Sequence, residues 1–325
     1  MKRAPGILLL LLLLASTTFA QNGTWARQRA GTMSWLHSVF FIDQNRGWAV
    51  GSKGTLLQTL DGGETWKPRG SLSSDDVVRD VFFIDEKTGW IVCEVNAYKL
   101  KLEEDPRAYL MKTIDGGESW TRVEIKGFEV DAILVRAFFN RNGRGWTFGE
   151  AGSIYTTRDA GDTWTKLQSP TRRLLLGGMF VDDDRGWLVG AGATIIQTSD
   201  GGETWYQSTL PQVEKSVRFT ATTFVDNRKG WAVGSGGNVY RTDNGGRTWQ
   251  RQESTVDVDL FDVKFVDAME GWAVGAEGTI IHTVDGGEHW TAERSGTQHP
   301  LERVFFTNRN RGWAVGFGGT VVAYR

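Results

Sequence analysis

The chain has 325 residues, with 37 basic and 39 acidic residues, one Cys and four His. A single thiol cannot form an intrachain disulfide. The Cys and His residues are few and none lie at the spacing of metal ligands, so we predict no metal site and no cofactor. The balanced charge provides no field that would attract nucleic acid, whereas the 15 Trp require a structural explanation.

The first twenty residues have the pattern of a secretory signal peptide. Lys2 and Arg3 precede an apolar run from Ile7 to Ala15, and small residues lead up to Ala20. This run is too short for a bilayer core of about 30 Å. We expect residues 1–20 to be removed, and residues 21–325 to be an exported, soluble, periplasmic or extracellular monomer.

A repeat occupies the remainder of the chain. Gly-Trp recurs seven times, and a Phe lies seven residues before each of these tryptophans, so we expect both to form the core between repeats. Short strands repeating about every 42 residues are typical of propeller blades. The tryptophans are Trp48, Trp90, Trp146, Trp187, Trp231, Trp272 and Trp313, and the phenylalanines are Phe41, Phe83, Phe139, Phe180, Phe224, Phe265 and Phe306.

Each repeat is interpreted as four strands. In the first repeat these are Val39 to Ile42, Gly47 to Gly51, Thr55 to Thr59, and an outer strand beginning at Trp66. The Asp-Gly-Gly turn before the outer strand suits a side chain that accepts backbone N–H groups, followed by residues with positive φ. We assign this structural role to Asp61 and Trp66, Asp115 and Trp120, Asp159 and Trp164, Asp200 and Trp205, Asp243 and Trp249, and Asp285 and Trp290.

The two ends of the chain complete one repeat. There are seven Gly-Trp strands but six Asp-Gly-Gly turns, and the chain ends with a third strand at Arg325. The segment from Gly23 to Gln28 resembles the outer strand at Glu64 to Arg69. We therefore predict one all-β domain at 21–325, a seven-bladed propeller of four-stranded blades closed by the N-terminal strand. Only Trp35 falls outside this scheme.

The motifs carry a family resemblance. Thr-x-Asp-Gly-Gly-Glu-Thr-Trp, as at Thr59 to Trp66, resembles the Asp-box or BNR repeat. Together with Gly-Trp-Ala-Val-Gly, it most resembles the photosystem II stability and assembly factors and their exported bacterial relatives. The resemblance implies a non-enzymatic scaffold that binds a membrane-protein subunit or another protein partner.

Two features could form the binding surface. An insertion at about 94–109 replaces the turn between strands two and three of blade two, and it is either a tolerated loop or a partner-contact arm containing Tyr98, Lys99 and Lys101. Arginines at the start of strand one could form a rim that recognises an acidic peptide, or they could be solvated charges neutralised by nearby acids. These arginines are Arg79, Arg136, Arg172, Arg173, Arg218 and Arg303.

The alternative function is a glycan-binding or sialidase-like glycoside hydrolase propeller. Such an enzyme needs two carboxylates at a defined separation, and Asp80 and Asp262 on the predicted channel strand are the candidates. The Phe-Arg-Ile-Pro segment of sialidases is missing, and we predict no catalytic residues. Cys93 lies among apolar residues, which predicts a buried, inert thiol.

Overall fold

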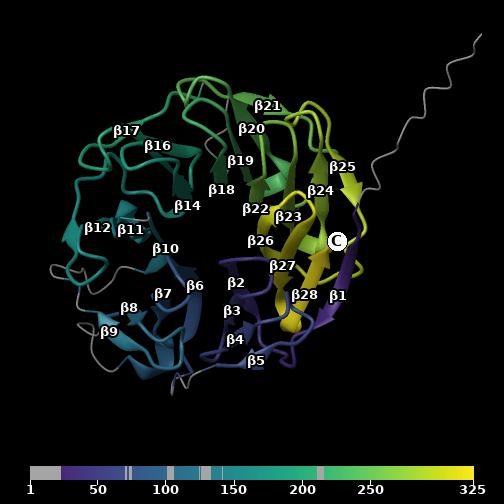
Figure 1. Cartoon of the computed structure of the whole chain (residues 1–325). Coiled ribbons are helices and arrows are strands. Elements are labelled where there is room, and N and C mark those ends of the chain that lie inside the picture. Colours follow the sequence, from purple (N-terminus) through teal and green to yellow (C-terminus); the bar gives the residue numbers. More distant parts are fainter. Residues whose placement is uncertain are drawn as a thin grey trace, which may run out of the picture.

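The computed structural model describes residues 23–69, 72, 75–100, 106–123, 125, 133–140, 142–210 and 216–325. These residues form seven four-stranded antiparallel sheets arranged in a ring (Figure 1). The predicted all-β seven-bladed propeller is confirmed. The expected signal peptide at 1–20 lies outside the described residues. Within them, no helix is long and apolar enough to cross a membrane.

In six blades the strands follow chain order from the centre outward, and in the last blade β1 is the outermost strand. The innermost strands are β2 (Leu36–Phe41), β6 (Val77–Phe83), β10 (Leu134–Phe139), β14 (Leu175–Phe180), β18 (Phe219–Phe224), β22 (Leu260–Phe265) and β26 (Leu301–Asn308). The second strands are β3 (Gly47–Gly51), β7 (Gly89–Glu94), β11 (Gly145–Gly149), β15 (Gly186–Gly190), β19 (Gly230–Gly234), β23 (Gly271–Gly275) and β27 (Arg311–Gly316).

The third and outer strands complete the sheets. The third strands are β4 (Leu56–Thr59), β8 (Ala108–Thr113), β12 (Ile154–Thr157), β16 (Thr194–Thr198), β20 (Val239–Thr242), β24 (Ile280–Thr283) and β28 (Thr320–Tyr324). The outer strands are β5 (Lys67–Pro68), β9 (Thr121–Val123), β13 (Thr165–Lys166), β17 (Tyr206–Gln207), β21 (Gln250–Gln252), β25 (Thr291–Glu293) and β1 (Trp25–Arg29). Short 3₁₀ turns are η1 (Ala97–Lys99), η2 (Glu150–Gly152), η3 (Ser235–Gly237), η4 (Ala276–Gly278) and η5 (Phe317–Gly319).

An aromatic stack joins every pair of neighbouring blades. Phe41 of blade one lies face to face on Trp313 of blade seven, with ring centroids 3.5 Å apart, and meets Trp66 of its own blade edge-on at 5.9 Å. The same two contacts recur at all seven interfaces. The glycine of Gly-Trp belongs to this packing, because a Cβ on Gly47 would lie 2.5 Å from the Phe41 ring.

A hydrogen bond reinforces most of these stacks. The Trp48 indole N–H donates to the Gly116 carbonyl in the turn of the next blade at 3.2 Å. Equivalent bonds join four other Gly-Trp tryptophans to the next turn. Of the seven Gly-Trp tryptophans, Trp90 and Trp272 have indole nitrogens with no partner among the described residues. The turn facing Trp90 has Ala160 in place of the first glycine, and the blade facing Trp272 has no such turn.

The Asp-Gly-Gly turns are built by their Thr and Asp side chains. In the first turn, the Thr59 hydroxyl donates to Asp61 at 2.8 Å and accepts from the Gly63 amide, and Asp61 also accepts from the Thr65 amide. The φ angles of +69° and +87° at Gly62 and Gly63 suit glycine. Hydrogen bonds such as the one from Thr65 hold the pKa of Asp61 below its usual value.

The assignment of Asp243 to the fifth turn is wrong. Asn244 takes the Asp-box position, because its side-chain oxygen accepts from the Thr242 hydroxyl at 3.0 Å and from the Thr248 amide at 3.0 Å. Asp243 lies one position earlier and instead pairs with Arg241 at 3.0 Å. An asparagine can replace the aspartate because these contacts need an acceptor oxygen rather than a charge.

The N-terminal strand closes the ring as predicted. Strand β1 pairs antiparallel with β28, placing Trp25 opposite Tyr324 (Figure 1). Trp25 meets Phe306 edge-on at 5.7 Å and therefore occupies the position that Trp66 has in blade one. Its indole N–H also donates to Glu293 of blade six at 2.8 Å. The last blade thus joins the two ends of the chain.

We predict that Trp25→Ala destabilises the protein by about 3–5 kcal/mol, the usual cost of truncating a buried Trp. Trp25 is 8% exposed and Trp35 is 36% exposed, so Trp35→Ala is the matched control and should cost about 1 kcal/mol or less. Urea unfolding measures both values. Equal losses in the two variants would contradict the closure by Trp25.

Candidate functional site

The innermost strands place one equivalent residue from each blade around the channel. Each of these residues pairs with the residue two positions after the Gly-Trp tryptophan, as Asp80 does with Val92. Around the ring they are Ser38, Asp80, Arg136, Gly177, Ala221, Asp262 and Arg303. Two arginines and two aspartates therefore face one another at one level of the channel.

These four charges form two ion pairs between non-adjacent blades. Arg303 donates to Asp80 at 2.6 Å, and Arg136 lies 3.5 Å from Asp262. All four side chains are at most 16% exposed. Burial lowers the pKa of Arg136 to about 10, and nearby Arg303 adds to this shift while Asp262 opposes it. The pairs cross the channel at this level.

Both aspartates also bind the backbone. Asp80 accepts from the Ala137 amide of the next blade at 3.2 Å, and Asp262 accepts from the Val304 amide at 3.0 Å. The amides at the inner edge of a propeller have no further strand to pair with, so a buried carboxylate satisfies them. These contacts give Asp80 and Asp262 a structural role.

The predicted arginine rim therefore contains fewer members than expected. Arg136 and Arg303 were placed on the rim, but they lie inside the channel because each innermost strand has a β-bulge just before this position. Arg79 lies at a bulge and pairs with Glu94 at 2.6 Å, and Arg218 lies 3.5 Å from Asp259. The side chains of Arg172 and Arg173 are exposed and contact no charged partner among the described residues.

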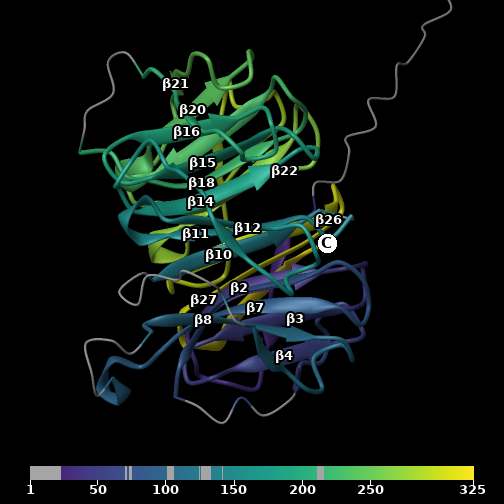
Figure 2. The same cartoon turned by 90° about the vertical axis from the view of Figure 1, so that its left-hand side faces the viewer.

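The blade-two insertion extends β7 and β8 beyond the other blades. Figure 2 shows their connection, with η1, projecting from one face of the ring. Tyr98 in η1 is 99% exposed, and Lys99 lies 3.5 Å from Asp76. Lys101 lies outside the described residues. Cys93, at the base of the insertion, is buried, and burial raises the pKa of its thiol to about 12.

A cluster at the channel opening was missed by the motif analysis. It contains Trp35, His37, Arg79, Glu302 and Phe317, and we call it the mouth cluster. The Trp35 ring stacks on His37 at 5.4 Å and meets Phe317 edge-on at 5.3 Å. Phe317 is 45% exposed. The available signal was that Trp35 alone has no place in the repeat.

The pKa values of two residues in the mouth cluster, His37 and Glu302, are shifted. Burial, together with Arg79 and Arg303, lowers the pKa of His37 to about 4, and its Nε2 lies 3.1 Å from the Ser52 hydroxyl. Burial raises the pKa of Glu302, against the opposing effects of Arg303 and of the hydrogen bond from Trp35. A neutral imidazole and an aromatic pair thus lie beside guanidinium groups, an arrangement suited to a ligand with apolar and anionic parts.

Comparison with known proteins identifies the family. The model of the family described as photosynthesis system II assembly factor YCF48 matches residues 17–165, 164–255 and 251–325. The chain belongs to this family. It is 28% identical over 135 residues to the photosystem II stability/assembly factor HCF136 of Arabidopsis thaliana, a match covering 40% of this chain and 30% of that protein.

Solved structures share the fold. A structure described as YCF48 bound to D1 peptide has a TM-score of 0.75 and 23% identity, covering 92% of this chain and 96% of its own. The GH74 enzyme of Niastella koreensis also matches, with a TM-score of 0.71 and 13% identity, covering 92% of this chain and 53% of the enzyme. Identities this low demonstrate the propeller alone, which hosts both binding proteins and enzymes.

We predict that His37 makes stability depend on pH. Its folded pKa of about 4 lies below the ordinary 6.5, so the unfolded chain binds a proton first as the pH falls. The contribution of neutral His37 to the free energy of unfolding is complete above pH 6.5 and is lost as the pH falls toward 4. After allowance for partial solvation, this loss is on the order of 2 kcal/mol. Urea unfolding at pH 7 and pH 4.5 should show a smaller loss for His37→Asn than for the wild type. The same pH dependence in both proteins would refute this role.

Proposed function

We propose that the protein is a non-enzymatic scaffold that holds an extended segment of a membrane-protein partner against the mouth cluster. The observation that carries the proposal is the exposed aromatic pair, Trp35 and Phe317, at His37, where the Arg79 and Arg303 guanidinium groups act. Exposed aromatic rings next to arginines are typical of protein-binding surfaces. Family membership and the fold shared with a peptide-bound YCF48 support this interpretation.

The wider face offers further contacts for such a segment. Arg172 and Arg173 are exposed at the start of blade four, on the face where the loops between blades lie. An acidic stretch of the partner could pair with their guanidinium groups. Tyr98, at the exposed end of the blade-two insertion, would contact a partner that extends beyond the ring.

The hydrolase alternative is less well supported. Its candidate carboxylates, Asp80 and Asp262, accept hydrogen bonds from backbone amides of the next blade and are paired with arginines. Both carboxylates are therefore engaged in contacts between blades, which leaves them poorly placed to act on a glycosidic bond. We further propose that the protein acts after export, as the pattern of residues 1–20 suggests.

Site-specific photo-crosslinking tests the proposed surface. A benzophenone side chain at Phe317 should crosslink one membrane-protein partner in the native envelope, whereas the same group at Tyr206, exposed on the opposite face, should not. Trp35→Ala combined with Arg172→Glu and Arg173→Glu should reduce the crosslinked yield at least tenfold. The control is Arg251→Glu, an exposed charge change on the outer strand β21.

The outcomes separate binding from folding. The variants must retain the wild-type melting temperature within a few degrees, so that a reduced yield reports on the surface. Equal crosslinking from Phe317 and Tyr206, or an unchanged yield in the triple variant, would place the partner elsewhere. Turnover of fluorogenic glycosides that is lost in Asp262→Asn would instead favour the hydrolase.

A further inference from the structure

The Asp-box turns link neighbouring blades through a recurrent ion pair. The residue after the two glycines is acidic in five of the six turns, and each of these acids pairs with a cation from the preceding blade. The pairs are Glu64 with Arg325, Glu118 with Arg69, Asp162 with Lys112, Glu203 with Arg144, and Glu288 with Arg241. An acid at this position therefore pairs with a cation at five of the seven interfaces.

The interface between blades four and five reverses this charge. The equivalent residue of the fifth turn is Arg247, and its side chain makes no hydrogen bond or ion pair with any other described residue. Arg185 and Arg228 lie at the same interface, in the turns that precede the Gly-Trp strands of blades four and five. Three guanidinium groups thus gather where the other interfaces have an ion pair.

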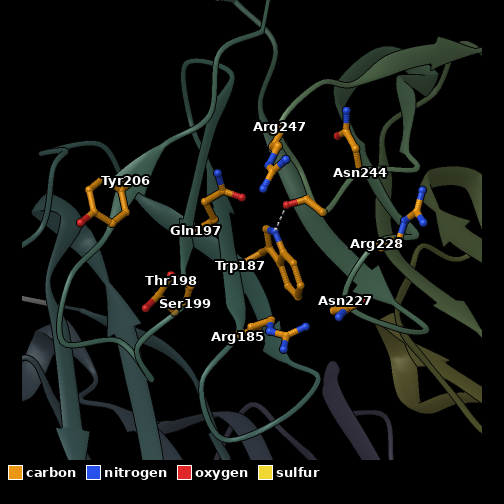
Figure 3. Close-up of a pocket in the computed structure, with 11 residues that line it drawn as sticks. Arg185, Trp187, Gln197, Thr198, Ser199, Tyr206, Asn227, Arg228, Asn244 and Arg247 are labelled. Atoms are coloured by element: carbon orange, nitrogen blue, oxygen red, sulfur yellow. Dashed lines mark hydrogen bonds between the residues drawn. The ribbon is translucent and has the colours of Figure 1, made fainter.

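These arginines line a cavity of about 590 Å³ on the Asp-box face. Figure 3 shows Arg247 above the Trp187 ring, Arg185 below it, and Arg228 at the side belonging to blade five. The Trp187 indole, which forms the floor between them, is fixed by its bond to the Gly245 carbonyl at 3.0 Å. None of the residues lining the cavity is acidic.

The nearby acids neutralise the cluster only in part. Asp182 pairs with Arg185 at 3.7 Å, and because both side chains are more than 40% exposed, water screens this pair. The Arg247 side chain has no acidic partner among the described residues. The Arg228 guanidinium donates to the Asp243 carbonyl oxygen at 3.4 Å, while the Asp243 carboxylate pairs with Arg241. The Arg228 amide donates to the Asp226 carboxylate at 2.7 Å. Like charges brought together at an interface disfavour one another, and a bound anion removes that repulsion.

The remaining lining describes the rest of the ligand. Gln197, Asn227 and Asn244 present amide groups, Ser199 a hydroxyl, and Tyr206 a ring that is 60% exposed. The cavity is larger than a single oxyanion needs, and its uncharged donors and acceptors match hydroxyl groups. An aromatic ring at the edge of such a cavity can pack against the apolar face of a sugar.

We propose that this cavity, the arginine pocket of Arg185, Arg228 and Arg247, binds the oxyanion of a small hydroxyl-rich molecule, a sugar acid or a sugar phosphate. Planar guanidinium forks bind carboxylate and phosphate oxygens in pairs, which gives both charge and geometry for this group. The pocket lies on the face opposite the mouth cluster, so the site is independent of the proposed partner-binding surface.

Titration calorimetry at constant ionic strength tests the pocket with glucuronate, glucose 6-phosphate and glucose. The wild type should bind at least one of the two anions saturably and should not bind glucose. Arg247→Glu should weaken binding at least tenfold, the effect of losing a charge-assisted hydrogen bond. Arg251→Glu makes the same charge change in the same blade outside the pocket and should leave affinity within twofold.

Stability separates loss of the site from loss of the fold. Arg247→Glu restores the acid found in the other five turns beside Arg185, so its melting temperature should equal or exceed that of the wild type while binding falls. A preference for glucuronate or for glucose 6-phosphate identifies the oxyanion. Absence of saturable binding of either anion, or equal affinity in Arg247→Glu and the wild type, would overturn the proposal.

Discussion

The structure depends on one repeated contact, the face-to-face stack between a phenylalanine of one blade and the Gly-Trp tryptophan of the blade before it. A four-stranded sheet cannot bury both of its faces alone, and each stack covers one face with rings that would otherwise meet water. The glycine beside the tryptophan allows the approach, since a methyl group there would overlap the ring of the phenylalanine on the adjacent strand.

Seven equivalent stacks make every blade depend on its neighbours, and Trp25 supplies the edge-on ring of the last blade, which has no Asp-Gly-Gly turn. Closure of the ring is therefore a condition for the whole core.

The repeated residues account for the core. Positions where a residue departs from the repeat therefore indicate where something other than packing determined the residue. Ala160 replaces a glycine in the turn that faces Trp90, and the Trp90 indole nitrogen has no acceptor among the described residues. The blade-two insertion replaces a tight turn with an exposed loop. Arg247 replaces an acid and leaves an interface with three cations, and Trp35 adds an aromatic ring outside the seven stacks between blades. The last two changes increase charge or exposed apolar surface without improving packing, which is the pattern expected when a surface is kept for binding.

The fold could be predicted from the sequence because each repeat carries the same information seven times. Blade number and closure follow from the period, the paired Phe and Trp positions and the unmatched final turn, without reference to distant contacts.

The site could not be predicted in the same way. Arg136 and Arg303 face the channel because of a β-bulge that has no sequence signature, and their partners Asp262 and Asp80 lie on non-adjacent blades. The choice between Asp243 and Asn244 depended on a single hydrogen-bonded register within a turn. Trp35 was visible as an exception, but its neighbours Glu302 and Phe317 come from the other end of the chain.

The central ion pairs also determine how the two faces of the ring can act. Arg303 pairs with Asp80 and Arg136 with Asp262 across the channel, and both aspartates also accept hydrogen bonds from the inner edges of the blades. Arg303 contributes to the low pKa of His37 and also pairs with Asp80. The ion pairs across the channel and the mouth cluster are therefore coupled electrostatically through Arg303. The arginine pocket lies between the turns of blades four and five. It contains none of the residues of the mouth cluster or of the ion pairs across the channel. Binding on one face can thus change without the other, since no charged group is common to both surfaces.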